Sequence, residues 1–214
     1  MKDFPMFDTA FGIASLVLKE IPYKGIAYII FREVWDAQQL LEECVSFCRM
    51  AGAERICASG HESLEKYPLY TSVLEMRGEA VVDNRDLKSL FPVTESTVSQ
   101  WRSLYNEKMR TVDNGATMTA FDEKRILQSG GAYFVHEQGE LLGIGWLDDM
   151  KLLAVAAVKP GSGKIVLNTL MSLVEGNGIY LEVASTNERA IRLYEKMGFI
   201  KTKEISRWYC VKNT

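Results

Sequence analysis

Apolar positions recur along this chain in two patterns, which divide it into expected strands and helices. Apolar runs at residues 26–31 and 152–158 are typical of buried strands, and the second predicts a central strand covered on both faces. Spacings of three and four predict helices that begin at Asp36 and Thr94. Residues 8–18 are harder to assign, and we expect a short helix there. The mixture of both patterns predicts an α/β protein.

The other expected elements complete two regions. We expect strands at residues 55–58, 71–76, 87–93, 132–136, 140–147 and 179–183, and helical segments at 63–67, 122–128, 165–175 and 187–197. Glycines end several of these helices, because glycine adopts a positive φ without strain. Residues 78–85 predict a linker. We therefore expect an N-terminal α/β region at residues 1–84 and a second domain at residues 85–214.

Composition places the chain among globular proteins. Of its 214 residues, 47% are hydrophobic and 25% are charged, and the formal net charge is −3. This charge gives no reason to expect nucleic-acid binding. No apolar run is long enough to cross a bilayer, so we expect no membrane association and a cytoplasmic protein.

The four cysteines raise the question of a metal site. Cys44 and Cys48 are four residues apart on an expected helix, and Cys57 and His61 have the same spacing. These spacings match no common zinc motif. We predict reduced thiols and no metal.

A motif near the C-terminus carries a family resemblance. Residues 179–199 predict a strand, a helix and the start of another strand, with Asn187, Ala190, Leu193, Tyr194, Gly198 and Phe199 at fixed spacing. This motif resembles the C-terminal motif of the GCN5-related N-acetyltransferases, the GNAT family. The segment from Leu90 to Met109 is similar to the first strand and helix of a GNAT domain. The resemblance implies a GNAT-like mixed, mainly antiparallel central sheet flanked by helices, with acetyl-CoA as the acyl donor.

A glycine-rich turn follows the central strand. Gly161, Ser162, Gly163 and Lys164 stand between that strand and a helix, where backbone N–H groups and the helix dipole favour a phosphate. Together with the family motif, this turn is predicted to bind the diphosphate of the donor. The loop is shorter than the GNAT pattern. An ordinary tight turn with a solvated lysine is the structural alternative.

The family resemblance also assigns a role to the end of the central strand. In GNAT proteins this strand bulges and separates from its neighbour, and its amides stabilise the thioester oxygen. The resemblance places these donors at Ala156, Ala157 and Val158. Packing of small residues beneath a helix explains the two alanines equally well.

Two residues of the motif receive predicted roles by resemblance. Tyr194 occupies the general-acid position, where a phenol can protonate the departing thiolate. Alternatively, it is a core aromatic residue with its hydroxyl at the surface. Asn187 occupies the position that binds the pantetheine arm, and it is also suited to cap the helix.

The sequence does not identify the base that deprotonates the acceptor. We considered the carboxylates of Glu137, Asp148, Asp149 and Glu182, of which Glu182 lies on the strand beside the predicted site. No cysteine falls at the centre of the expected sheet. We therefore expect direct attack rather than an acyl-enzyme.

The leading hypothesis is an enzyme, an N-acetyltransferase that transfers acetyl from acetyl-CoA to a primary amine of a small molecule or peptide. An acyl-CoA-binding regulatory protein without catalysis is the alternative. A third hypothesis is an interaction module, in which open sheet edges pair within the chain or between two chains, as in a homodimer. Residues 55–62 and 181–188 echo each other, so the N-terminal region resembles a degenerate half of the same fold. A coincidental strand–helix–strand is the other explanation.

Overall fold

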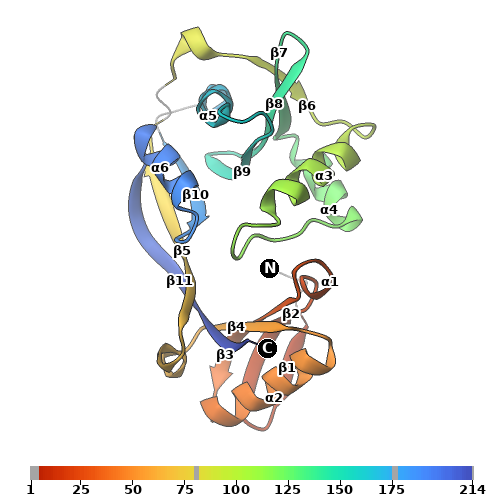
Figure 1. Ribbon diagram of the computed structural model, residues 1–214, viewed down its shortest axis with the longest axis vertical. Coiled ribbons are helices and arrows are strands. Elements are labelled where there is room, and N and C mark those ends of the chain that lie inside the picture. The colour runs from red at the N-terminus through yellow and green to blue at the C-terminus, as the bar shows by residue number, and fades with distance from the viewer. Residues whose placement is uncertain (1–4, 80–81, 175–177, 214) are drawn as a thin grey trace. The chain divides into compact units, whose positions relative to one another are not determined.

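The computed structural model describes residues 5–79, 82–174 and 178–213. Contacts divide the chain into two compact units. Unit 1 comprises Met1–Val73 and Glu204–Thr214, and unit 2 comprises Leu74–Lys203. The domain boundary predicted between residues 84 and 85 stays a prediction. The α-helices and strands of both units are labelled in Figure 1.

Unit 1 is a sheet with one long helix. Its elements are β1 (Met6–Thr9), β2 (Gly12–Val17), α1 (Ile21–Lys24), β3 (Ile26–Val34), α2 (Ala37–Met50), β4 (Arg55–Ser59), the 3₁₀ helix η1 (Glu62–Lys66), the start of β5 (Leu69–Gly78) and the end of β11 (Ile200–Asn213). The strand order is β1-β2-β3-β4-β11. β3 and β4 are parallel, whereas the pairs β1–β2, β2–β3 and β4–β11 are antiparallel.

The helix α2 confirms the start predicted at Asp36. The Asp36 carboxylate accepts hydrogen bonds from the backbone N–H groups of Gln38 and Gln39, which the first turn leaves without intrahelical partners. Leu40, Cys44 and Cys48 then recur on one face and are fully buried against β2, β3 and β4. Apolar spacing and a cap therefore suffice to define this helix.

The helix expected at residues 8–18 is wrong. β1 and β2 form a hairpin there, with Thr9 opposite Gly12. Gly12 has φ +147°, and a Cβ at this position would lie 2.4 Å from the Glu33 carbonyl oxygen. Pairing with β3 fixes this segment as a strand, and a local pattern does not contain that long-range interaction.

Unit 2 contains a second sheet segment with helices on both faces. Its further elements are η2 (Asn84–Asp86), β6 (Ser89–Pro92), α3 (Val98–Met109), α4 (Ala120–Ser129), β7 (Ala132–Glu137), β8 (Glu140–Asp148), β9 (Lys151–Ala157), α5 (Gly163–Met171), β10 (Ile179–Ala184) and α6 (Glu188–Lys196). The strand order is β11-β5-β10-β9-β8-β7-β6.

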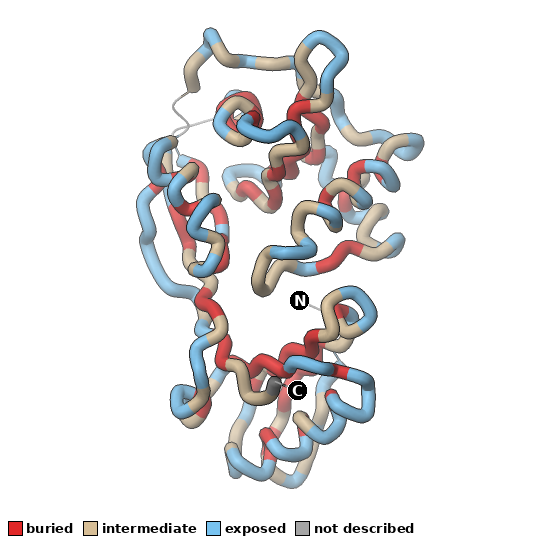
Figure 2. The backbone as a smooth tube through the Cα atoms, viewed as in Figure 1, coloured by how far each residue is buried: buried red, intermediate tan, exposed pale blue. Residues whose placement is uncertain are grey.

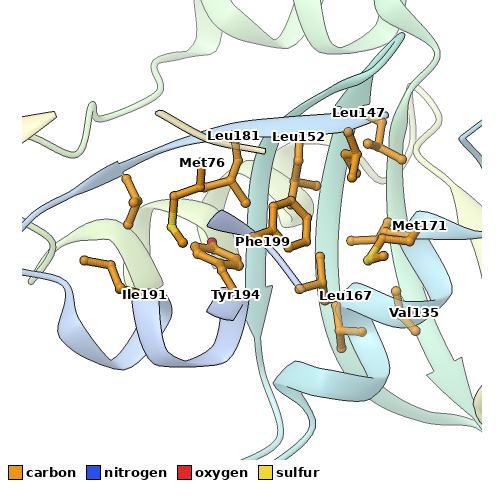
Figure 3. Packing of buried hydrophobic residues seen from close by; sticks show 14 of the residues in the cluster. Met76, Val135, Leu147, Leu152, Leu167, Met171, Leu181, Ile191, Tyr194 and Phe199 are labelled. Carbon is orange, nitrogen blue, oxygen red and sulfur yellow. The ribbon is translucent and has the colours of Figure 1, made fainter. Parts of the chain in front are cut away.

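Two hydrophobic clusters cover the two faces of this segment. On one face, α3 and α4 contribute Trp101 and Ile126 to a cluster with Trp146 of β8. On the other face, α5 and α6 pack against β5, β9 and β10, and Figure 3 shows this cluster. In Figure 2, buried residues follow the strands and the inner faces of the long helices. The predicted mixed, mainly antiparallel sheet flanked by helices is confirmed.

Most predicted elements of unit 2 are present with shifted ends. α3 begins at Val98, after a turn in which the Val98 N–H donates to Thr94 O, so the start predicted at Thr94 is early. α5 spans Gly163–Met171 rather than 165–175, and residues 175–177 lie outside the described residues. Residues 80 and 81 of the predicted linker also lie outside them.

The segment after this gap is held by α5. The Asn168 amide side chain, 3% exposed, accepts from Asp83 N–H and donates to Asp83 O, each at 2.9 Å. Thr169 Oγ1 accepts from Lys88 N–H at 3.3 Å. These buried polar side chains therefore fix the path of the chain into β6.

Two strands contribute residues to both units. β5 begins in unit 1, but its residues from Leu74 onward belong to unit 2, beside β10. β11 begins in unit 2, and its residues from Glu204 onward belong to unit 1, beside β4. The end of β11, which follows unit 2 in the sequence, therefore completes the sheet of unit 1, and the end of β5, which follows unit 1, belongs to the sheet of unit 2. Among the described residues, no helix has the length and apolar character that crossing a membrane requires.

Candidate active site

The parallel strands β9 and β10 separate after a short paired stretch. Among the described residues, their ladder joins only Lys151 with Tyr180 and Leu152 with Leu181. β9 continues to Ala157 and β10 to Ala184 without further ladder pairs. The parallel pair β3–β4 of unit 1 is joined over five successive residue pairs. The separation is thus specific to unit 2, where the sequence predicted it.

A bulge in β9 decides which amides face the separated side. Trp146 of β8 lies opposite Ala154, whereas Leu147 lies opposite Leu152, so Leu153 is the extra residue. The Val158 N–H donates to Leu142 O at 2.9 Å. Because alternate amides of a strand point the same way, the Ala156 amide also faces β8.

The Ala157 amide therefore faces the side of β10, and within the described residues no ladder pair joins the two strands beyond Leu152. Of the three predicted oxyanion donors, Ala157 is the one that this geometry favours. The Val158 amide is occupied by Leu142 O. Val155 shares the direction of Ala157, and sequence reasoning did not include it. Only the position of the bulge would have indicated which amides of β9 face β10.

The glycine-rich turn ends in a helix N-terminus. Gly161 has φ +87°, and α5 begins at Gly163. The first intrahelical bond of α5 joins Val166 N–H to Ser162 O, so the amides of Gly163 and Lys164 precede it. Together with the helix dipole, these amides suit an anion such as a diphosphate.

Ser162 stabilises the turn from beneath. Its side chain is buried, and its Oγ donates toward Leu142 O at 2.7 Å and Lys159 O at 2.8 Å. The hydroxyl is therefore engaged by backbone carbonyl groups, and only the backbone of Ser162 is suited to contact a ligand. Lys159 forms an ion pair with Glu140 at 2.6 Å.

Gly163 makes the turn fit closely against its neighbours. A Cβ at this position would lie 3.2 Å from Cδ2 of Leu193 in α6 and 4.0 Å from the Cβ of Ala157. The turn, the end of β9 and α6 thus meet at one place. The structure brings Ala157, Gly163 and the helix that carries Tyr194 together.

Tyr194 projects from α6 into the core of unit 2. Its side chain is 8% exposed, and its ring centroid lies 5.8 Å from that of Phe199. Figure 3 shows the ring beside Met76 and Phe199. Burial raises the pKa of Tyr194 to about 12, so the phenol keeps its proton at neutral pH. The ring is a core aromatic, and the hydroxyl remains a proton donor.

Asn187 is the N-cap of α6. Its side-chain oxygen accepts a hydrogen bond from Ala190 N–H at 3.3 Å. This satisfies one amide of the first turn, which is the capping alternative predicted from the sequence. The side-chain NH₂ group is the part of Asn187 that is suited to donate to a ligand.

The carboxylates considered as bases lie in other surroundings. Glu182 forms an ion pair with Lys151 at 2.5 Å, at the paired end of β9 and β10. The Lys88 ammonium, 2.8 Å from Glu137, lowers the pKa of that carboxyl group. Asp148 and Asp149 form the turn between β8 and β9, at the opposite end of β9 from the glycine-rich turn. The structure therefore assigns no base among them.

The cysteine spacings have structural explanations. Cys44 and Cys48 are buried in the core of unit 1, and burial raises their pKa values to about 12 and about 11. The Nδ1 atom of His61 accepts the Ser63 N–H and begins η1. Within the described ranges, no group of three or more His, Cys, Asp or Glu side chains is arranged to hold a metal.

The sheet, the separated strands and the glycine-rich turn define the fold of the acyl-CoA-dependent N-acyltransferases. Residues 98–199 match the family model described as the acetyltransferase (GNAT) family. This part of the chain is therefore a GNAT acetyltransferase domain. No curated protein matches the chain in sequence.

Solved structures share this fold over nearly the whole chain. A conserved protein of unknown function from Staphylococcus epidermidis ATCC 12228 is 10% identical, with a TM-score of 0.61, over 98% of this chain and 94% of that one. A GNAT-family acetyltransferase from Colwellia psychrerythraea is 13% identical, with a TM-score of 0.53, over 97% and 84%. A probable N-acyltransferase from Enterococcus faecalis V583 is 8% identical, with a TM-score of 0.59, over 93% and 58%. At these identities the similarity concerns the fold.

Proposed function

We propose that this chain is an N-acetyltransferase that moves the acetyl group of acetyl-CoA to a primary amine by direct attack. The observation that carries the proposal is the separation of β9 from β10 beside the glycine-rich turn. It leaves the Ala157 amide without a strand partner and brings it close to the start of α5. The family match and the fold support the same class of reaction.

In this proposal the protein binds acetyl-CoA at its diphosphate, along its pantetheine arm and at its thioester. The amides of Gly161, Gly163 and Lys164 bind the diphosphate at the positive end of α5. The Asn187 NH₂ group donates to an amide oxygen of the pantetheine arm. The Ala157 N–H donates to the thioester oxygen, where negative charge grows during attack.

Tyr194 completes the proposed chemistry as the general acid. The amine nitrogen forms a bond to the acyl carbon while the carbon–sulfur bond breaks, and the Tyr194 phenol gives its proton to the departing thiolate. The phenol is protonated at neutral pH, as this step requires. The proton of the amine leaves to water, since no carboxylate is assigned as base, and the Tyr194 phenolate then takes a proton back from water.

The test measures turnover and donor binding separately. The chain is incubated with acetyl-CoA and a panel of small-molecule and peptide amines, and release of the coenzyme A thiol is followed. Calorimetry with coenzyme A reports binding. Amine-dependent thiol release supports the proposal. Binding without turnover for every amine favours the regulatory alternative, and absence of binding contradicts both.

The acceptor, the cytoplasmic location and a homodimer stay predictions. The proposal needs no metal and no nucleic acid. The interaction-module alternative predicts association of the chain without any affinity for coenzyme A. Sedimentation of the same preparation therefore separates it from the enzymatic proposal.

A further inference from the structure

Two cysteines of unit 1 face each other across a strand pair. In the antiparallel pair β4–β11, Cys57 lies directly opposite Cys210. Residues directly opposite in a sheet carry their side chains on the same face. Cys57 is fully buried and Cys210 is half-buried, and both are reduced. This pairing was invisible in the sequence, because 152 residues separate the two thiols.

The hydrogen bonding shows which type of pair this is. The Cys210 N–H donates to Pro68 O at 2.8 Å, on the β5 side of β11, and so points away from β4. Cys57 and Cys210 therefore form a non-hydrogen-bonded pair, in which the Cα atoms are about 4.5 Å apart. Disulfides span Cα separations of about 4.4–6.8 Å. An ideal pair of this type therefore has a Cα separation that a disulfide can span.

We propose that Cys57 and Cys210 form a reversible disulfide. The Cys210 thiol now lies 3.6 Å from Lys212 O, within its own strand, so rotation of this side chain precedes the bond. The inference goes beyond the acyl transfer proposed above and does not depend on it.

Thiol–disulfide exchange with oxidised glutathione provides a balanced route. The half-buried Cys210 thiolate attacks glutathione disulfide, forms a mixed disulfide and releases one reduced glutathione. The Cys57 thiolate then attacks the Cys210 sulfur and releases the second. The two protein thiols lose two electrons, and glutathione disulfide gains them. The two protons pass to the released glutathione thiols.

The bond is expected to be easily reduced. A Cα separation of about 4.5 Å lies at the short end of the usual range, and disulfides held away from their preferred geometry are more reducible. It would close a loop that contains all of unit 2, because residues 74–203 lie between the two cysteines in sequence. It would also fasten the end of β11 to β4.

The chain contains its own control pair. Cys44 and Cys48 are four residues apart on α2 and belong to the same core cluster. Burial raises the pKa of Cys44 to about 12 and that of Cys48 to about 11, so few thiolates are present to react. Oxidation at this pair would therefore argue against a specific site.

The experiment uses the full chain in glutathione buffers of increasing oxidised fraction. After acid quenching and alkylation, peptide mapping identifies any linked cysteines. We expect the reactive thiols to fall from four to two, with a linked Cys57–Cys210 peptide that reduced glutathione reverses. Cys44→Ser should still form the link, whereas Cys210→Ser should not.

Hydrogen exchange gives a second, independent measurement. In the oxidised chain, amides of residues 204–213 should exchange more slowly than in the reduced chain, because the bond ties this strand end to β4. The proposal fails if no linked peptide forms. It also fails if Cys210 stays glutathionylated beside a reduced Cys57, or if Cys44 or Cys48 is the linked partner.

Discussion

Burial keeps the Tyr194 hydroxyl in its neutral form. The ring packs in the core, where water is scarce, and the cost of placing a charge there raises its pKa to about 12. A neutral phenol is a donor rather than a base. The phenol is protonated at neutral pH at its ordinary pKa as well, and the higher pKa makes it a weaker acid, so the proposed proton transfer depends on a thiolate held close to the hydroxyl.

Tyr194→Phe removes this proton and keeps the ring. We expect kcat to fall by roughly 10²-fold, the lower end of what general acids contribute, while coenzyme A affinity changes little. Steady-state kinetics and calorimetry measure the two effects. Tyr133→Phe, on β7 of the same unit, is the matched control and should keep kcat. An unchanged kcat in Tyr194→Phe would remove the acid role.

Asn187 combines a cap with a proposed ligand contact, and two substitutions separate them. Asn187→Ala loses the acceptor for Ala190 N–H, which should cost about 1 kcal/mol of stability. Asn187→Asp keeps a capping oxygen but loses the NH₂ donor. We expect Asp to preserve stability in urea unfolding and to weaken coenzyme A binding in calorimetry. Equal binding by Asp and Asn would show that Asn187 is a cap alone.

At the scale of elements, β9 shows what the sequence contains and what it omits. Its apolar run identified a buried strand, and the family motif predicted its separation from β10, which the ladder shows. The bulge at Leu153 was not visible, because every position of the run is apolar and a shift of one residue leaves the pattern unchanged. The direction of the Val158 amide, set by this bulge, could not be predicted.

Long-range pairing explains the other differences. Glu182 looked like a candidate base within its own strand, but the register of β9 and β10 places Lys151 beside it. Helix caps and glycine stops are local, and they predicted α2 and α6 well. Hairpin β1–β2 depends on β3, which lies outside any local window.

The carboxylate of Glu75 joins β5 to β11 within unit 2. Arg77 Nε donates to it at 2.7 Å, Thr202 Oγ1 donates at 2.9 Å, and Lys203 lies 3.2 Å away. The hydrogen bond from Arg77 and those from Thr202 and Lys203 lower the pKa of Glu75 from 4.5 to about 2. The ionised form is therefore favoured in the folded chain.

The lowered pKa of Glu75 predicts that the free energy of unfolding falls at acidic pH. A lowered folded-state pKa contributes stability that is present above pH 4.5 and is lost as the pH falls toward about 2. Glu75→Gln should lower the melting temperature at pH 7 and flatten its fall between these pH values. Melting curves across the pH range measure both effects. Glu95→Gln, an exposed carboxylate, should follow the parent chain, and identical curves for Glu75→Gln would contradict the assignment.

At the scale of the whole molecule, the shared strands limit where the chain can be cut. A fragment of residues 85–214 lacks the Leu74–Gly78 part of β5 and with it Met76, which is fully buried in the core of unit 2. We expect this fragment to lose cooperative melting. A fragment of residues 69–206 keeps β5 and the start of β11, and it should melt cooperatively and bind coenzyme A.

Circular dichroism melting and calorimetry compare the two fragments. The loss expected from the missing Met76 alone is about 2–5 kcal/mol, since removing a large buried side chain leaves a cavity. Cooperative melting of the 85–214 fragment at the temperature of the longer one would show that β5 is dispensable for unit 2.

The placement of Glu204–Thr214 in unit 1 also orders events on the ribosome. Residues 1–73 are synthesised before unit 2, yet the strand that pairs with β4 is synthesised after it. Unit 1 is therefore completed only after unit 2 has been made, and until then the edge of β4 that pairs with β11 is exposed to chaperones and to other nascent chains.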